Sequence, residues 1–236
     1  MDLFGTSMEY DWRIFTEDKK LSIPQLQSLS GCAIIQFQNS VKWLELELEE
    51  DFFSSSPVLK WIYLHIGSLK ELSPDSKFYM IESIDIFKMQ DGPDVLRYFQ
   101  GRQAFLWVYR YGSLDFIEFV NRWKSGNAFQ KLEYLMCHAF SSYDSIENEV
   151  LNAVGAKYID ATKQPPTHTL PLQLVQVHCD SKPNTDTITS YAYVVRETDG
   201  HVASILFQET DFRFGVWDKT EEEFLSMVEY LQSGIS

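Results

Sequence analysis

The residues whose types could do chemistry meet in the segment WKSGN, residues 123–127, where a lysine, a serine and a glycine are adjacent. Such residues can cradle a phosphate when a glycine loop leads into a helix N-terminus, whose free N–H groups and positive dipole end hold an anion. Here the order is reversed, because the predicted helix precedes the segment and a strand follows it. Lys124 falls in the last helical turn, and Gly126 suits the left-handed position after a helix. The segment is therefore predicted to end a helix rather than to bind phosphate.

The remaining sequence contains no recognisable catalytic or metal-binding pattern. P-loop, dinucleotide-binding, nucleophile-elbow and H-E-x-x-H motifs are absent. Cys137 and His138 are adjacent, as are His178 and Cys179, but neighbours on a strand point to opposite faces, so each pair offers at most one ligand to a common metal. We expect no catalytic residue, no metal, no cofactor and no enzyme. A composite site using both pairs and an enzyme of unrecognised chemistry are the minor alternatives.

Charge and composition bound the class of partner. The chain has 236 residues, a net charge of −14 and 44% hydrophobic residues, so it can bury a sizeable core. Acidic runs occupy residues 45–51 and 221–223. A negative field repels phosphate backbones, which excludes nucleic acid as a direct partner. The charge is typical of a soluble protein, and the alternative interpretation is a protein partner with a basic surface.

The sequence predicts an intracellular protein. Its three cysteines, Cys32, Cys137 and Cys179, are far apart, which favours a reducing compartment over a disulfide framework. The first residues lack a basic segment followed by an apolar one, so no secretory signal is visible. No apolar run reaches the roughly eighteen residues that a membrane helix needs. We expect a cytoplasmic or nuclear protein with no membrane partner.

Five runs in the first two thirds of the chain alternate apolar and other residues with the period of a strand. These runs are residues 41–48 (VKWLELEL), 61–66 (WIYLHI), 81–87 (IESIDIF), 104–109 (AFLWVY) and 132–137 (LEYLMC). Short helices are expected between and after them, beginning near Asp91, at Ser113 and at Asp144 or Ser145. Their uneven spacing is near the length of leucine-rich units, which predicts an α/β fold of irregular leucine-rich-repeat-like strand–helix units.

The pattern changes after residue 163. Residues 164–171 form a proline-rich linker that can hold neither a helix nor a central strand. Residues 191–217 then read as an antiparallel three-stranded meander, with Asp199–Gly200 as a hairpin turn. The run Thr220 to Glu223 is a capping box that opens a terminal helix. We expect an N-terminal segment over residues 1–34, a domain over 35–217, divided into units over 35–163 and a linker with meander over 164–217, and a C-terminal helix over 218–236.

Two blocks of the chain resemble a known family, the nematode F-box-associated domain of type two. Residues 116–135 (FIEFVNRWKSGNAFQKLEYL) are similar to its helix that runs into tryptophan, Gly-x-Asn and Leu-Glu-x-Leu. The meander resembles its second recurrent line, through Arg196, Asp199, Gly200, Ala203, Ile205, Phe212, Phe214, Val216 and Trp217. The resemblance covers about residues 35 to 217. One departure is Ala128–Phe129, where the family usually carries a proline.

The resemblance implies a role in binding rather than catalysis. Such domains follow an F-box, a helical module that docks onto the Skp-type adaptor of a cullin ubiquitin ligase, and they are thought to capture the target protein. No F-box is recognisable in residues 1–34, where residues 23–29 are at most a remnant. We therefore expect a partner-binding adaptor similar to a ubiquitin ligase substrate receptor, with the Skp-type adaptor itself doubtful. The alternative is a structural subunit or scaffold of a larger assembly.

Strand alternation separates two faces of the predicted sheet. Leu44, Leu46, Leu48, Ile62, Leu64, Ile66, Ile84, Ile86, Leu106, Val108, Leu135 and Cys137 would face the helices. The opposite face would carry the candidate partner-binding residues Glu45, Glu47, Tyr63, His65, Asp85, Phe87, Trp107, Tyr109, Tyr134 and Met136. Aromatic residues anchor protein interfaces, so an open face of this kind predicts a binding strip. Equally, the meander or the N-terminal segment could cover it and make these residues core.

Overall fold

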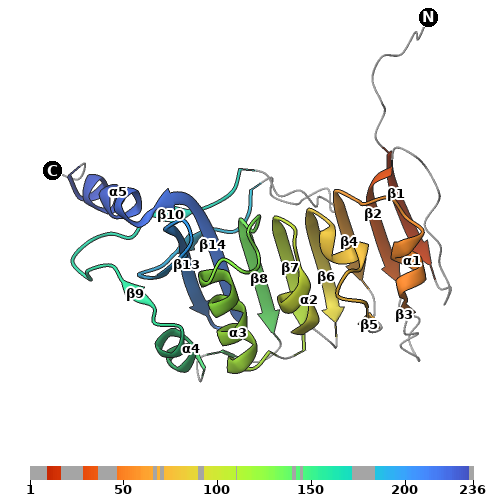
Figure 1. The fold of residues 1–236 in the computed structure, drawn as a ribbon, viewed down its shortest axis with the longest axis horizontal. Helices are drawn as coiled ribbons and strands as arrows, with labels where there is room; N and C mark the ends of the chain where they lie inside the picture. Colours follow the sequence, from red (N-terminus) through yellow and green to blue (C-terminus); the bar gives the residue numbers. More distant parts are fainter. Residues whose placement is uncertain are drawn as a thin grey trace, which may run out of the picture.

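A single ten-stranded sheet dominates the computed structural model (Figure 1), which describes residues 10–16, 29–36, 47–65, 68–69, 72–89, 93–109, 111–139, 142–143, 146–171 and 184–233. The strand order is β1-β2-β4-β6-β7-β8-β14-β13-β12-β9. Neighbours from β1 to β8 are parallel, and those from β8 to β9 are antiparallel. The fold is therefore mixed α/β, with a parallel half and an antiparallel half.

In the parallel half, the strands follow one another across the sheet in chain order. They are β1 (Tyr10–Thr16), β2 (Leu29–Gln36), β4 (Trp61–His65), β6 (Ser83–Met89), β7 (Gln103–Val108) and β8 (Tyr134–Ala139). Crossovers between parallel strands are right-handed, so strands that advance in one direction receive their connecting elements on one face. These elements are α1 (Glu50–Ser54), the 3₁₀ helix η1 (Lys77–Met80), α2 (Pro93–Tyr98) and α3 (Ser113–Lys124), followed by α4 (Glu147–Ala153) after β8 (Figure 1).

The main core lies between the sheet and these helices, on what we call the helix face. Ile62, Leu64, Ile84, Ile86, Leu106, Val108, Leu135 and Cys137 all face it, as their alternation predicts. From the helices, Phe53, Phe78, Leu96, Phe116 and Trp123 complete the same cluster. Leu48 is also buried there, whereas Leu44, Leu46 and Ile66 lie outside the described residues.

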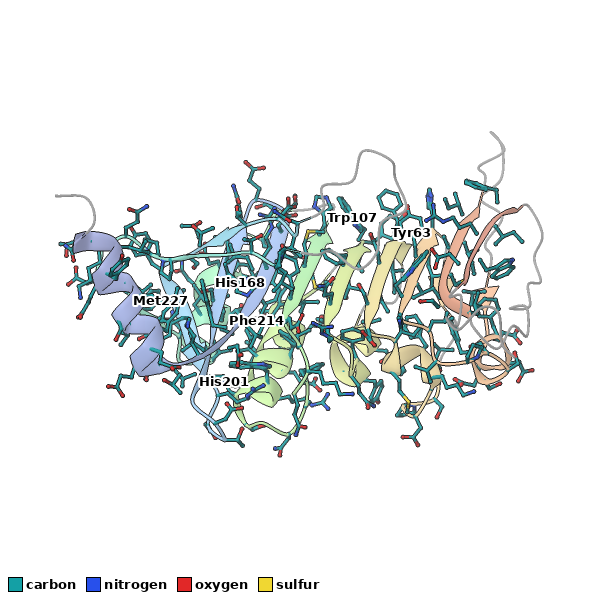
Figure 2. All side chains as sticks on the ribbon, turned by 90° about the horizontal axis from the view of Figure 1, so that it is seen from above. Tyr63, Trp107, His168, His201, Phe214 and Met227 are labelled. Carbon is teal, nitrogen blue, oxygen red and sulfur yellow. The ribbon has the colours of Figure 1, made fainter. Side chains whose placement is uncertain are left out.

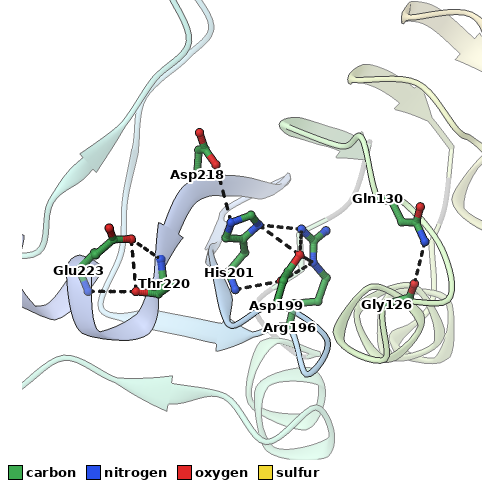
Figure 3. A network of polar contacts seen from close by, with 8 residues as sticks. All are labelled: Gly126, Gln130, Arg196, Asp199, His201, Asp218, Thr220 and Glu223. Atoms are coloured by element: carbon green, nitrogen blue, oxygen red, sulfur yellow. Dashed lines mark hydrogen bonds and ion pairs between the residues drawn. The ribbon is translucent and has the colours of Figure 1, made fainter.

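The antiparallel half contains the predicted meander and the terminal helix. Its strands are β9 (Lys157–Tyr158), β12 (Ala192–Val195), β13 (His201–Gln208) and β14 (Asp211–Thr220), and α5 (Glu221–Ser233) follows. Gly200 has φ of 75° at the turn between β12 and β13. Thr220 N–H donates to Glu223 Oε2 at 2.8 Å, and Glu223 N–H donates to Thr220 Oγ1 at 3.4 Å, so the predicted capping box is present (Figure 3).

The WKSGN segment lies where the turn of the antiparallel half packs against the parallel half. α3 ends at Lys124, and Gly126 has φ of 71°. Lys124 Nζ donates to the carbonyl of Val154 at the end of α4, so its charge satisfies a helix C-terminus. A Cβ at Gly126 would meet the side chain of Thr198 at 2.4 Å, so the β12–β13 turn rests directly on this glycine. The prediction of a helix stop is confirmed.

Beside this joint, Arg196 holds the β12–β13 turn against Trp123. Its guanidinium carbon lies 5.1 Å from the centroid of the Trp123 ring. Arg196 Nε donates to Asp199 Oδ1 at 2.9 Å, and its NH2 group approaches His201 Nδ1 at 2.9 Å (Figure 3). Trp123 also stacks edge-on against Phe214 at 5.1 Å. The two blocks that resemble the F-box-associated domain therefore pack against each other.

Several predicted boundaries differ from the structure. Of the run 41–48, only Glu47–Leu48 is described, and this strand (β3) pairs with β5 (Ser68–Leu69) in a separate two-stranded sheet. The strand next to β4 is instead β2, which the sequence did not predict. The expected divisions after residues 34 and 217 fall inside β2 and β14. The described part of residues 1–34 forms strands of the main sheet rather than helices.

Candidate functional site

The face of the sheet opposite the helices, which we call the far face, presents side chains in three rows set by the strand register. The first row runs through Phe15, Ile35, His65, Phe87, Trp107, His138 and Asp211. The second runs through Arg13, Ala33, Tyr63, Asp85, Phe105, Met136 and Arg213. The third runs through Asp11, Gly31, Trp61, Ser83, Gln103, Tyr134 and Gly215. Figure 2 shows Tyr63 and Trp107 on this face, away from the helices.

Within the first row, four rings from four neighbouring strands touch in series. His65 and Phe87 have centroids 4.8 Å apart, Phe87 and Trp107 5.4 Å, and Trp107 and His138 4.5 Å. We call these four residues the aromatic row. Each of them is partly exposed, and they lie towards the carboxyl ends of the parallel strands. A continuous, partly exposed strip of rings across a sheet is a feature of binding surfaces rather than of solvated ones.

One end of the aromatic row is fixed by a polar pair. His138 Nδ1 lies 2.6 Å from Asp211 Oδ1, and Asp211 Oδ2 accepts a hydrogen bond from Arg213. A histidine held by a carboxylate is half of a nucleophile-activating pair, but the nucleophile must then face the opposite ring nitrogen. Thr210 Oγ1 lies 3.4 Å from the same Nδ1 instead. The pair therefore orients the His138 ring against Trp107.

Asp85 lies in the second row, surrounded by aromatic side chains. Its register partners are Tyr63 on β4 and Phe105 on β7, and Phe87 follows two residues later on its own strand. Asp85 Oδ1 is buried and has no hydrogen-bond partner. Burial raises the pKa of this carboxyl to about 7. Burial, together with the nearby Asp85, raises the pKa of the Tyr63 phenol to about 12.

Part of the far face is covered by the chain itself, which corrects the expectation for two candidate residues. The short strands β10 (Thr167–His168) and β11 (Ile188–Thr189) pair with each other and lie over β13 and β14. Tyr134 and Met136 are buried in a cluster with Phe105 and Ile188. Both therefore belong to a second core rather than to an open strip.

His168 anchors this covering segment to the sheet. Its Nε2 donates to the carbonyl of Val216 at 2.9 Å, and its ring stacks at 6.3 Å on Tyr134 and edge-on at 5.0 Å on Trp217. Burial lowers the pKa of His168, so the ring stays neutral. The proline-rich segment thus serves as a lid over the antiparallel half, with only the two residues of β10 in strand conformation.

Near the edge of the antiparallel half, α5 covers the far face. Phe224 packs on Tyr193 at 5.3 Å and on Trp217 at 5.5 Å, and Val228 joins the same cluster. Trp217 Nε1 donates to Ser204 Oγ at 2.9 Å on the sheet. On β4, β6, β7 and β8, the same face carries the partly exposed aromatic row.

The predicted strip is therefore only partly assembled as expected. His65, Asp85, Phe87 and Trp107 are brought together, Tyr63 is buried beside them, and Tyr109 is 46% exposed just after β7. Glu45 lies outside the described residues, and Glu47 is in β3, away from the main sheet. Sequence reasoning missed His138, because the predicted strand stopped one residue before it, and Ile35, whose strand was not recognised.

The cysteines and histidines of the described ranges form no second site. Cys137 is buried on the helix face while His138 lies on the far face, as strand alternation predicts, so the pair cannot share a metal. Burial raises the pKa of the Cys32 thiol to about 12 and that of Cys137 well above its usual value. No group of three potential metal ligands occurs in the described ranges, and His178 and Cys179 lie outside them.

A groove on the helix side carries three basic residues. Arg97, Arg122 and Lys131 line it, together with Tyr98 and Phe129. However, Arg97 lies near Glu118 at 3.6 Å, and Arg122 donates to the Arg97 carbonyl at 2.6 Å. Both α2 and α3 end beside this groove, and helix C-termini repel anions. These residues are therefore held in structural contacts rather than arranged around a ligand.

Comparisons with known proteins add no template for this arrangement: no family model, no curated protein and no solved structure matches the chain. In the part of the chain that the structure describes, no helix is long and apolar enough to cross a membrane. The functional interpretation therefore rests on the geometry of the far face.

Proposed function

We propose that the protein is a protein–protein interaction module whose partner lies along the aromatic row. The observation that carries this proposal is the series of ring contacts from His65 to His138, on the face that the connecting helices leave uncovered. Rigid aromatic side chains contribute large contact areas at low entropic cost, and they dominate binding energy at protein interfaces.

The leucine-rich-repeat-like interpretation is part of the same proposal. Six parallel strands in chain order, with their connecting helices on one face, support it. Solenoids of that kind bind partners on the face that their strands present. By resemblance, we propose a partner-binding adaptor similar to the substrate-recognition part of an F-box ubiquitin ligase receptor. The direct packing of residues 116–135 on the meander supports treating these two blocks as one unit.

The test is a quantitative affinity purification from cell extract with three forms of the chain. These forms are the wild type, the double variant Trp107→Ala/Tyr109→Ala, and the control Tyr158→Ala. Tyr158 is 59% exposed on β9, the edge strand of the antiparallel half, which is separated from β8 by β14, β13 and β12. We expect the wild type and the control to retain the same partner, and the double variant to lose at least about tenfold of it.

Thermal unfolding of the three forms decides how the result is interpreted. We expect the double variant to unfold within a few degrees of the wild type, because both rings are partly exposed. Equal recovery of the same partners by all three forms would overturn the proposal. So would a large loss of stability in the double variant, since it would place these rings in the core. Recovery of the Skp-type adaptor would favour a ligase receptor over an adaptor without a ligase.

A second candidate function, a structural subunit of a larger assembly, is favoured by the surface of α5. Leu225, Tyr230 and Leu231 on this helix are 37%, 78% and 38% exposed. An amphipathic helix with such residues can pack permanently against another subunit. In the same purification, one stoichiometric partner that survives the double variant and is lost on Leu225→Ser/Leu231→Ser would favour this function.

A further inference from the structure

Unpartnered polar atoms concentrate on the far face of the sheet. Eight buried side-chain polar atoms of the described residues have no hydrogen-bond partner. Five of them lie on or against this face: Ser83 Oγ, Asp85 Oδ1, Tyr134 O–H, His168 Nδ1 and Arg213 Nε. Leaving such a group unpaired costs about 1–3 kcal/mol, so each requires an explanation. Tyr134, His168 and Arg213 lie at or beside the β10–β11 segment, whereas Asp85 lies beside the aromatic row.

Asp85 differs from the other four residues because it is a carboxylic acid surrounded by aromatic side chains. Tyr63 and Phe105 flank it at the same register, and His65, Phe87 and Trp107 stand one step further along the strands. No basic side chain of the described residues neutralises it, and burial is the cause of its raised pKa. Arg13, in the same row, is three strands away and lies over the Trp61 ring at 6.0 Å.

We propose that Asp85 and the rings around it form a subsite for a single basic side chain of the partner protein. The inference rests on the proposed function and specifies the chemistry that the far face recognises. A guanidinium or ammonium group would donate to Asp85 Oδ1 while its stem and charge lie against Phe87 and Trp107. Both contacts are stronger in a site from which water is excluded than at a solvated surface.

Charge complementarity favours a cation over a neutral occupant. The chain has a net charge of −14, which attracts basic segments and raises their rate of encounter. A hydroxyl or an amide could also donate to Asp85 Oδ1, but neither would gain from the faces of the surrounding rings. An apolar side chain would leave the carboxyl oxygen unpaired. A basic residue flanked by apolar ones therefore fits this face best.

The experiment selects peptides from a random displayed library on immobilised full-length protein, with Trp107→Ala protein as the counter-selection. We expect the enriched peptides to share an arginine or a lysine next to apolar residues. Dissociation constants are then measured for one enriched peptide and for versions with citrulline, a neutral isostere of arginine, or lysine at the basic position. Citrulline should weaken binding to the wild type at least about tenfold and change binding to Asp85→Asn little.

The outcomes separate this inference from the proposed function. Peptides that depend on Trp107 but bind equally with arginine and citrulline would overturn the basic subsite and leave the interaction module in place. Equal affinity of the wild type and Asp85→Asn for the basic peptide would do the same. If no selected peptide depends on Trp107, both proposals fail. The lysine version shows how the cation is recognised. If the guanidinium stacks on the rings, replacing arginine by lysine should weaken binding, whereas if only the point charge matters, the affinity should be preserved.

Discussion

The two halves of the sheet share one core on the helix face but differ in how their far face is covered. In the antiparallel half, α5 and the β10–β11 segment cover it, and His168 and Phe224 fill the interface. In the parallel half, the described cluster around Trp61 and Tyr63 consists of strand residues alone. Within the described residues, the antiparallel half is therefore covered on both faces, whereas the parallel half carries the partly exposed aromatic row on its far face.

Chain connectivity explains this difference. Antiparallel strands are joined by tight turns, so the flanking segments remain free to return across either face. Parallel strands need crossovers, and when strand order advances in one direction all crossovers occupy one face. Parallel sheets are usually buried on both faces. Among the described residues, no helix covers the far face of the parallel half, and this face carries the aromatic row, so it is the part of the sheet that we expect a partner to complete.

The largest predicted effect concerns the joint between the halves. Trp123 is fully buried and contacts both Phe214 and Arg196. Trp123→Ala should lower the free energy of unfolding by about 3–5 kcal/mol, measured by urea denaturation, because it opens a cavity and removes the support of a buried guanidinium. The matched variant Trp107→Ala should cost less than half as much, because its ring is partly exposed.

Trp123→Phe keeps this comparison testable if the alanine variant does not fold. Phenylalanine retains the edge contact with Phe214 and removes an indole N–H that has no hydrogen-bond partner. Trp123→Phe should therefore lose less free energy of unfolding than Trp123→Ala. Equal losses at Trp107 and Trp123 would mean that the far face of the parallel half is as much a core as the joint.

Local patterns were enough to predict the helix face and the turns. Ile84, Ile86 and Leu106 face the helices because alternation with period two places them there. Asp199–Gly200 and the capping box are short signals in which a few residues determine their own geometry. β2 was missed, since its sequence LSGCAIIQ is a nearly continuous run of small and apolar residues without alternation.

Long-range contacts account for the rest of the candidate site. Tyr134 and Met136 were expected to be open, but Ile188, distant in the sequence, covers them. Nothing in the alternation of β8 encodes that contact. Likewise, the surroundings of Asp85 depend on the register of three strands, so its unpaired oxygen could not be anticipated. Sequence placed these residues on the correct face but could not show which of them would remain accessible.

A second, smaller effect should appear in the pH dependence of stability. Asp85 keeps its proton up to about pH 7 in the folded chain, against about pH 4 when unfolded. The folded state then binds more protons in this window, so the contribution of Asp85 to stability falls as pH rises from about 4 to 7, by at most about 4 kcal/mol. Tyr63 and His65 are the titratable groups that face it from β4.

Asp85→Asn should remove this loss of stability. The difference in free energy of unfolding between Asp85→Asn and the wild type, measured by urea titration, should therefore grow in favour of the variant as pH rises through the same range. Asp199, in the antiparallel half, provides the opposite case: hydrogen bonds from Arg196 lower its pKa. Its contribution to stability is present above its unfolded pKa and is lost as pH falls through the folded value. The pH profile of stability of Asp199→Asn should therefore differ in shape from that of the wild type only at acid pH. A parallel pH profile for wild type and Asp85→Asn would show that the Asp85 carboxyl is solvated.

The smallest predicted effects come from two glycines that occupy the third row in different halves. A Cβ at Gly31 would lie 2.0 Å from the Trp61 ring, and one at Gly215 would lie 2.7 Å from the His168 ring. Both alanine variants should lose about 1–3 kcal/mol through overpacking. Trp61 is fixed on a strand of the sheet, so Gly31→Ala should lower the stability of the whole domain.

His168, in contrast, belongs to a covering segment that can lift while the sheet stays folded. Gly215→Ala should therefore lower the global free energy of unfolding less than Gly31→Ala, and it should increase amide hydrogen exchange selectively at β10 and β11. Exchange measured by mass spectrometry on both variants checks this difference. If Gly215→Ala increased exchange uniformly across β13 and β14 as well, the β10–β11 segment would be an integral layer of the fold, and the two halves would be closed by equally strong packing.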